Sequence, residues 1–546
     1  MKRSILVPGV VLAVAVLTGG WLLQEGVERE ENVYVRVRLF EEVVDLVARQ
    51  YVDEVDRAGL YEHAVEGVLE SLGDPNTSFI AASDYENFRI RTQGTDYGGV
   101  GLEILEEDGW ITVQAPIPGT PGARAGIRAG DRFVEIEGQD AQGWDVERAV
   151  DALRGEAGTE VDVRIRRIGV DDPIPFTLTR ERIQLKAVPF ALMLDEDIGY
   201  VPLRVFRETS SSEVRAAIDS MGVGQMRGLV LDLRGNPGGL LDEGVGVSDL
   251  FLGAGLDVVE TRGRAAGQDR KFSASDPESY EGLPVVVLVD ETSASASEIV
   301  AGALQDHDRA LVLGNVTWGK GSVQMLHNLS GGGALRLTTA RWFTPVGRSI
   351  DRHQGEGLAP ELVRGALAVD GRLTVRADTE ERPVFESASG RTLYGGGGIT
   401  PDVIVLPDTL STSEQSGVRA LDRQAGVFKR ALFNYAARYI QEHPDLAPGF
   451  VIDDVAVDEF YDVLTENGVT ASREAYSDAG RFVTYHLGRE IALQMWGEVG
   501  EFRRIQPDDR QLVRARELLI ESGGSPDALV QMAGGPAATS SVEVPE

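Results

Sequence analysis

Residues 285–299 read VVVLVDETSASASEI, a pattern that predicts a buried strand, a tight turn and then a helix. The strand is a run of branched apolar residues ending at Val289, and the helix begins near Ser295 with small residues on either side. A serine at a helix N-terminus lies beside outward-pointing backbone amides and the positive end of the helix dipole. Those amides would stabilise an oxyanion formed next to the serine, so the stretch is compatible with a nucleophile.

The same residues allow a purely structural interpretation. Ser295 to Glu298 match the S-x-x-E pattern of a capping box, in which the serine only closes the first helical turn. From the local sequence alone, capping is the commoner use of such a serine. The spacing also does not distinguish Ser293, Ser295 and Ser297 from one another, so the nucleophile remains open at this point.

A second segment, residues 317–324, reads TWGKGSVQ and places Lys320 between two glycines. Lysine is scarce in this chain, with five in total, and arginine fills the ordinary surface positions. A lysine amine packed against a sheet would be desolvated and its pKa lowered, which a neutral general base requires. The alternative is a solvated loop lysine.

Residues 314–320 also match the G-x-x-x-x-G-K pattern of a phosphate-binding loop. Gly321 stands where that loop needs Ser or Thr for magnesium, and residues 323–329 do not have a helical pattern. Nucleotide binding is therefore kept only as a minor hypothesis. The six histidines are scattered without metal-ligand spacing, and His307 lies about three turns beyond Ser295. No metal or cofactor is expected.

Composition bounds the class of protein. The chain has 546 residues, enough for about three or four units, and its hydrophobic fraction of 42% is that of a globular protein. Its net charge of −34 argues against a nucleic-acid partner and against adsorption to anionic lipid. Cysteine is absent, so neither disulfides nor a thiolate nucleophile can occur.

The N-terminus predicts export. Lys2 and Arg3 precede an apolar run over residues 5–23 that is about long enough to span a bilayer. Because no clear small-x-small cleavage site follows, a membrane anchor through residues 4–23 is slightly favoured over a cleaved signal peptide. Either interpretation places the rest of the chain outside the cytoplasm, in the periplasm or cell envelope.

Patterns along the chain predict six regions. Helical periodicity runs from 33 to 72, short strands and turns from 93 to 185, alternating strands and helices beyond 186, and helices again from about 410 to 530. The strands at 198–206, 229–233, 285–289, 311–313 and 335–339 are expected to form one mixed or parallel sheet. The predicted regions are 1–25 (signal peptide or anchor), 26–92 (helical), 93–185 (a small domain), 186–408 (an α/β core with an insertion at about 355–395), 409–533 (helical) and 534–546 (a disordered tail).

Five separated segments together resemble the C-terminal processing peptidases, also called tail-specific proteases. They are LGDPNTSF at 72–79, DLRGNPGG at 232–239, SASASEI at 293–299, TWGKGSVQ at 317–324 and GITPD at 398–402. The resemblance covers roughly residues 35 to 405. Asn76 stands where the family often has His. The resemblance implies an α/β multidomain protein whose ClpP/crotonase-like protease core carries an inserted PDZ domain at 93–185.

The resemblance also implies the site residues. Ser295 would be the nucleophile, Lys320 the general base and Gln324 the residue that orients the lysine. The oxyanion hole would consist of the amides of Gly239 and Ala296. The PDZ domain would hold a peptide carboxylate with the backbone of one loop, which consists of Gly99, Val100, Gly101 and Leu102.

The expected function is therefore a serine endopeptidase that captures a free protein C-terminus and cleaves through an acyl-enzyme. Its partners would be protein or peptide substrates with free C-termini. A catalytically inactive PDZ scaffold is the alternative. The homo-oligomeric state and the role of the C-terminal helices are left open.

Overall fold

The computed structural model describes residues 34–93, 97–107, 109–167, 170, 172–195, 197–352, 366–374 and 382–534. The predicted signal or anchor segment 4–23 and most of the predicted tail (535–546) lie outside these ranges. Within them, no helix is long and apolar enough to cross a membrane. The chain divides into two compact units, one of Met1–Tyr85 with Gln324–Thr338 and one of Glu86–Val323 with Thr339–Glu546.

The first unit begins with helices, as the periodicity of residues 33–72 predicts. Residues 34–50 and α2 (Arg57–Glu70) are helical, and β1 (Ser78–Ile80) follows. Strand β1 pairs antiparallel with β18 (Ala334–Phe343), which in turn pairs with β17 (Ser322–Asn328). The turn between α2 and β1 is closed by Asp74, which accepts hydrogen bonds from Asn76 N and Thr77 Oγ1 at 3.0 and 2.6 Å.

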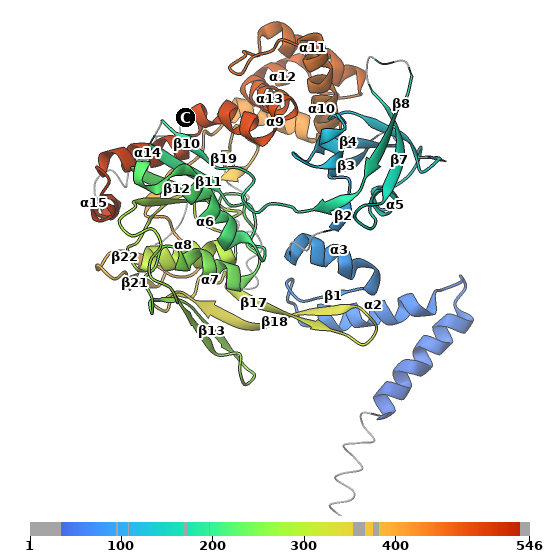
Figure 1. Ribbon diagram of the computed structural model, residues 1–546. Helices are drawn as coiled ribbons and strands as arrows, with labels where there is room; N and C mark the ends of the chain where they lie inside the picture. Colours follow the sequence, from blue (N-terminus) through green and yellow to red (C-terminus); the bar gives the residue numbers. More distant parts are fainter. Residues whose placement is uncertain are drawn as a thin grey trace, which may run out of the picture. The chain divides into compact units, whose positions relative to one another are not determined.

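The second unit contains a six-stranded sheet, the core sheet, ordered β10-β11-β12-β15-β16-β23. Its strands β10, β11 and β12 are labelled in Figure 1. All neighbours are parallel except β10 and β11, which confirms the expected mixed sheet. The strands are β10 (Leu192–Leu194), β11 (Ile198–Pro202), β12 (Gly228–Asp232), β15 (Val285–Val289), β16 (Leu311–Gly314) and β23 (Val403–Ile404).

The prediction that residues 335–339 continue this sheet is wrong. They belong to β18, whose later residues pair antiparallel with β13 (Asp257–Gly263). Strand β13 also pairs with β14 (Arg270–Ser273), and neither was predicted as a strand. A short strand pattern shows that a segment is extended but not which sheet it joins, because edge partners are set by contacts distant in sequence.

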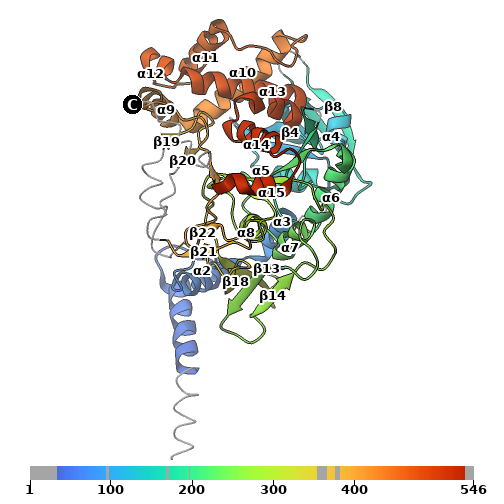
Figure 2. The same cartoon turned by 90° about the vertical axis from the view of Figure 1, so that its left-hand side faces the viewer.

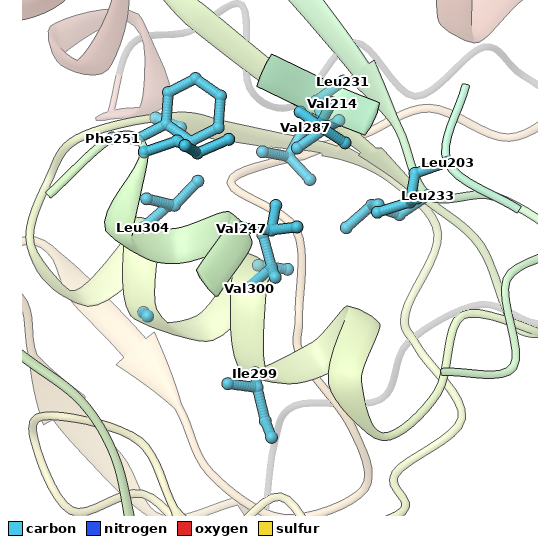
Figure 3. Close-up of a cluster of buried hydrophobic side chains, with 14 of the residues drawn as sticks. Leu203, Val214, Leu231, Leu233, Val247, Phe251, Val287, Ile299, Val300 and Leu304 are labelled. Atoms are coloured by element: carbon cyan, nitrogen blue, oxygen red, sulfur yellow. The ribbon is translucent and has the colours of Figure 1, made fainter. Parts of the chain in front are cut away.

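Helices cover both faces of the core sheet (Figures 1 and 2). One face packs on α6 (Ser210–Met221), α7 (Leu241–Asp249) and α8 (Ala296–Asp306), through side chains such as Leu231, Val287 and Val300 (Figure 3). The opposite face presents the alternate residues Val230 and Val286 to α14 (Arg510–Glu521) and α15 (Pro526–Gln531). The helices α14 and α15 are therefore packed on the core sheet.

The region predicted as a PDZ domain has a core of its own. Its sheet has the order β3-β4-β5-β7-β8, with β6 paired to β5, and β2 pairs separately with β9. Strand β3 lies at an edge of the sheet, beside α5. The elements are β2 (Tyr97–Gly99), β3 (Leu102–Glu107), β4 (Trp110–Pro116), α4 (Pro121–Arg124), β5 (Arg132–Ile136), β6 (Gln139–Asp140), α5 (Val146–Leu153), β7 (Glu160–Arg166), β8 (Ile174–Thr179) and β9 (Glu181–Ile183).

The helices before α14 form a separate apolar cluster, which confirms the helical pattern predicted beyond residue 410. They are α9 (Thr412–Asp422), α10 (Ala425–Glu442), α11 (Asp454–Glu466), α12 (Arg473–Asp478) and α13 (Gly480–Ile505), the last broken at Gly497. The described parts of the predicted insertion form two short hairpins. These are β19 (Ala366–Leu367) with β20 (Leu373–Thr374), and β21 (Val384–Glu386) with β22 (Thr392–Tyr394).

Candidate active site

Ser295 stands immediately before α8, at the end of the turn that follows β15. Its backbone has φ 55° and ψ −114°, which differs from the extended conformation usual at an N-cap. Positive φ is unfavourable for a residue with a side chain, and such strain concentrates at functional sites. The side chain is partly exposed. The sharp turn therefore presents the hydroxyl group at the start of a buried helix.

The neighbouring serines are fully buried and are used structurally. Ser293 Oγ donates to Leu233 O at 2.8 Å and accepts from Asp290 N at 3.0 Å. Ser297 Oγ donates to Asn236 O at 2.9 Å. Both hydroxyl groups hold the turn against the loop that follows β12, so of the three serines only Ser295 is accessible from outside.

The Gly235–Gly239 loop after β12 lies directly against Ser295. A Cβ added to Gly238 would lie 2.8 Å from Ser295 Cβ and 2.6 Å from Ala294 O. Gly239 has φ +150°, and a Cβ there would lie 2.1 Å from Phe206 O. Both positions require glycine because side chains would overlap the backbone that they approach. The contact between Gly238 and Ser295 brings two segments of the family pattern into one site.

Two backbone amides beside Ser295 are available to a ligand. Ala296 opens α8, where the first amides of a helix have no partner within the helix. Gly239 adjoins a bridge to Phe206, in which Phe206 N donates to Gly238 O and Leu240 N to Phe206 O. Among the described residues, neither the Ala296 amide nor the Gly239 amide donates to a protein acceptor. These are the two amides that the resemblance implies for an oxyanion hole.

Glu298 connects the serine turn, which comprises residues 290–295, to the lysine segment, which comprises residues 317–324. Its buried carboxylate accepts from Ser295 N at 2.7 Å, so the glutamate half of the predicted capping box is formed. The same oxygen accepts from Lys320 N at 2.9 Å. The other oxygen accepts from Gly319 N at 2.7 Å and from Thr317 Oγ1 at 2.5 Å. Burial raises the pKa of Glu298, although these donors oppose the shift.

Lys320 is therefore brought near Ser295 through its backbone. Its side chain is partly buried, and its carbonyl oxygen accepts from the Trp342 indole at 3.0 Å. The flanking glycines allow close packing, because a Cβ on Gly319 would lie 2.9 Å from Gly398 N and one on Gly321 would lie 2.8 Å from Asp351 Cβ. The GITPD segment thus packs against the lysine segment.

The fold argues against the hypothesis that residues 314–320 bind a nucleotide. A phosphate-binding loop must lead from a strand into a helix, whereas residues 314–320 lead from β16 into β17. The His307 side chain has a structural contact away from Ser295, because its Nε2 lies 2.7 Å from Asp257 O. Among the described residues, no three His, Cys, Asp or Glu side chains are grouped as a metal site.

Gln324 lies on β17, four residues after Lys320, in the first unit. Its side-chain amide approaches Thr338 Oγ1 of the neighbouring strand at 3.4 Å. The side chain is partly buried.

The predicted carboxylate-binding loop lies between β2 and β3. Gly101 has φ +69°, and a Cβ there would lie 2.2 Å from Thr120 Cβ. The loop carbonyls are occupied, since Val100 O accepts from Gly122 N at 2.8 Å and Gly101 O from Ile117 N at 3.0 Å. Among the described residues, the amides of Val100 and Gly101 donate to no protein acceptor. A backbone loop with free amides next to an edge strand suits a peptide carboxylate.

Several known protein families match parts of this chain. The models of peptidase family S41, the PDZ domain and the activating protease CtpB N-terminal domain match residues 197–363, 112–167 and 22–83. A carboxy-terminal-processing protease from Bartonella bacilliformis is 43% identical over 338 residues, which are 61% of this chain and 76% of that protein. The chain belongs to this family of S41 peptidases. It is a serine-type peptidase with a PDZ domain.

Other relatives of this S41 peptidase carry similar names. The carboxyl-terminal-processing protease of Synechocystis is 35% identical over 335 residues, covering 60% of this chain and 76% of that protein. The carboxy-terminal processing protease CtpA of Bacillus subtilis is 32% identical, covering 58% and 66%. Among solved structures, the photosystem II D1 C-terminal processing protease is 32% identical, with a TM-score of 0.33, covering 57% and 89%.

Two acidic residues of the site were missed or under-interpreted in the sequence. The sequence predicts only a capping role for Glu298, although its carboxylate also accepts a hydrogen bond from the Lys320 backbone amide. Asp290 was not singled out, although it is buried and holds the serine turn. The only signal for either was an acidic residue next to an apolar strand or within a helix of small residues, which is too common to be specific.

Proposed function

We propose that the S41 peptidase cleaves proteins near their free C-termini, with Ser295 as nucleophile and Lys320 as general base. The observation that carries this proposal is the position of Ser295. It is the accessible serine of its turn, and it lies beside two backbone amides that donate to no acceptor among the described residues. The backbone amides of Ser295 and Lys320 also donate to the same carboxylate oxygen of Glu298. A second supporting feature is the PDZ loop, where the amides of Val100 and Gly101 have no acceptor in the part of the chain that the structure describes.

The proposed chemistry needs no cofactor. The neutral amine of Lys320 takes the proton of the Ser295 hydroxyl as the oxygen attacks the scissile carbonyl. The amides of Gly239 and Ala296 stabilise the negative charge on the tetrahedral oxygen. The protonated lysine then gives its proton to the leaving amine. Water hydrolyses the acyl-enzyme, with Lys320 acting again as base. In this scheme Gln324 orients the lysine amine, as the family resemblance implies.

Substrate capture is assigned to the PDZ domain. A peptide would add as a strand to the free edge of β3, and its terminal carboxylate would accept from the amides of the loop formed by residues 99–102. Main-chain pairing of this kind tolerates many sequences and requires a free carboxylate. The peptidase would thus choose substrates by their termini more than by their internal sequence.

This proposal is tested with a pair of long fluorogenic peptides that differ only in carrying a free or an amidated C-terminus. We expect the free acid to be cleaved at least about tenfold more efficiently, because the amide loses a charge-assisted contact with the loop. Gly101→Ala should abolish the difference, since its Cβ would overlap Thr120 and the residue has positive φ. The measurement is kcat/KM for each peptide.

Gly138→Ala is the matched control. Gly138 has φ +73° in the same domain, but a Cβ there meets nothing within 4 Å. This variant should carry comparable backbone strain and still prefer the free acid. Equal cleavage of the two peptides by the unmodified enzyme would show that the C-terminus is not what the PDZ domain recognises.

The N-terminal helices support association with a second copy. Both expose apolar side chains at helical spacing, and exposed apolar patches of this kind mark interaction surfaces. On the first helix, Arg36 and Arg38 precede Glu41 and Glu42, so two antiparallel copies would pair opposite charges. The exposed apolar residues are Val35, Leu39, Val43 and Leu46 of the first helix and Tyr61, Val65 and Val68 of α2.

Sedimentation velocity should therefore show a dimer that Leu39→Glu combined with Val43→Glu converts to monomer. Glu62→Gln, an exposed polar change on α2, should leave the sedimentation coefficient unchanged. A monomer at all concentrations would rule out self-association through this face.

The predicted N-terminal segment would place the folded units outside the cytoplasm, in the periplasm or cell envelope, and fractionation of tagged protein tests that location.

A further inference from the structure

A buried aspartate holds the two loops of the active site together. Asp290 lies at the end of β15 and accepts from Ser293 N at 3.0 Å and from Thr292 Oγ1 at 2.7 Å within the serine turn. It also accepts from Gly235 N at 3.2 Å, at the start of the loop that carries Gly239. One carboxylate thus fixes the turn before Ser295 and the loop that supplies the second proposed oxyanion amide.

A cation from a distant segment completes this contact. Arg372, in the hairpin of β19 and β20, donates through a terminal guanidinium nitrogen to Asp290 Oδ2. Its Nε donates to Asp370 Oδ2 at 2.7 Å, so one guanidinium bridges two carboxylates. Burial lowers the pKa of Arg372, but Asp370 and Asp290 more than offset this effect, and the pKa lies above its usual value. A guanidinium paired in this way with two carboxylates has a fixed orientation.

The hairpin itself is anchored in the C-terminal region. Val369 N donates to Asp408 O, and Leu410 N to Leu367 O, each at 2.8 Å, so the hairpin pairs with the segment that leads into α9. Leu367 and Val369 also pack on the apolar cluster of the helices α9 to α13. The hairpin that carries Arg372 is therefore held by the helical region and by the segment that leads into it.

A second arginine repeats the arrangement on the neighbouring strand. Arg234, which begins the Gly235–Gly239 loop, binds Asp232 at 2.8 Å and Asp509 at 2.8 Å. Asp509 caps α14 by accepting from Leu512 N at 3.1 Å. Each of the two active-site loops thus forms an ion pair with a segment that lies C-terminal to residues 197–363, the part that matches the peptidase family.

We propose that Arg372 is a positioning residue, through which the C-terminal helical region fixes the serine turn and the oxyanion loop in their catalytic geometry. This role rests on the proposed function of Ser295 and Gly239, although the bridge can be tested independently of activity. Arg372 does not touch the reacting atoms. Its removal would leave Asp290 buried with an unpaired charge and would loosen both loops.

Two readouts test the role of Arg372 in the full chain. In Arg372→Ala we expect kcat to fall by about 100-fold with KM changed less than about threefold, because small displacements of catalytic groups cost rate more than binding. Hydrogen exchange should become faster at the amides of residues 233–239 and 290–296. Arg372→Lys should have an intermediate kcat, since one ammonium group cannot bridge two carboxylates as a guanidinium does.

Arg473→Ala is the matched control, because Arg473 forms an exposed ion pair with Asp458 in the same helical region. It should change neither kcat nor exchange at the two loops. Unchanged exchange at both loops in Arg372→Ala would overturn the positioning role whatever the activity. If the exchange changes but Ser295→Ala retains full activity, the proposed nucleophile is wrong while the bridge stands. If Arg372→Ala does not fold, the kcat and loop exchange of Arg372→Lys decide.

Discussion

Ser295→Ala is expected to abolish peptide hydrolysis, with kcat reduced by at least about 10⁴-fold, while the protein remains folded. The hydroxyl is partly exposed, and alanine at this position keeps the backbone amide that donates a hydrogen bond to the Glu298 carboxylate. The loss would therefore report chemistry and not packing. The measurement is kcat on a fluorogenic peptide, with circular dichroism and thermal unfolding to establish that the variant is folded.

Ser297→Ala provides the matched control two residues away. Its hydroxyl is buried and donates to Asn236 O, so its removal should lower stability by about 1–3 kcal/mol through the unsatisfied acceptor. Its kcat should fall far less than that of Ser295→Ala. A larger loss of kcat in Ser297→Ala than in Ser295→Ala, with both variants folded, would mean that the nucleophile has been assigned to the wrong serine.

Lys320→Ala and Lys320→Arg should both lose hydrolysis almost completely, by about 10³-fold or more. Arginine keeps the positive charge but cannot act as a neutral base near neutral pH. The similarity of the two variants is the informative result, because a lysine that served only as a cation would be replaced well by arginine. The backbone contacts of residue 320 with Glu298 and Trp342 do not depend on the side chain.

Lys271→Arg is the control for the lysine substitutions. Lys271 is exposed and pairs with Asp257 at 2.6 Å, so arginine should replace it without loss of activity. Retention of more than half of the activity in Lys320→Arg would contradict the general-base role. It would leave Ser295 in need of another proton acceptor.

Much of the site could be predicted from short segments, because its residues lie at the ends of strongly patterned elements. The apolar run Val285–Val289 is a buried strand, and α8 begins one residue after Ser295. The local pattern does not tell which of three serines is the candidate nucleophile, whereas burial distinguishes them. Ser293 and Ser297 are buried, and Ser295 is partly exposed. Burial depends on the loop after β12, which local sequence does not place.

The contacts that join distant segments could not be predicted. The guanidinium of Arg372 reaches Asp290 across 82 residues of sequence, and Arg234 reaches Asp509 across 275. Neither pair has a periodic or motif signal. The same limit applies to α14, whose apolar face predicts burial but not that it covers the core sheet. Long-range partners follow from the assembled fold, which explains why the C-terminal helices were left without a role.

The alternative of an inactive PDZ scaffold makes a different prediction from the peptidase account. Both expect the PDZ loop to bind a free carboxylate, but a scaffold needs no accessible serine beside free amides. The geometry around Ser295 favours a working site, because the positive φ of Ser295 and the close glycine contacts lie there. Two backbone amides without an acceptor among the described residues lie beside them. The two hypotheses differ in whether an acyl-enzyme forms.

The most direct test is the mass of the protein after reaction with an activated peptide ester and rapid quenching in acid, which preserves an acyl-enzyme. We predict a mass increase of one acyl group, located on Ser295 by proteolytic mapping, absent in Ser295→Ala and formed much more slowly in Lys320→Ala. An acyl group on another residue, or turnover of the ester by Ser295→Ala at the unmodified rate, would contradict it.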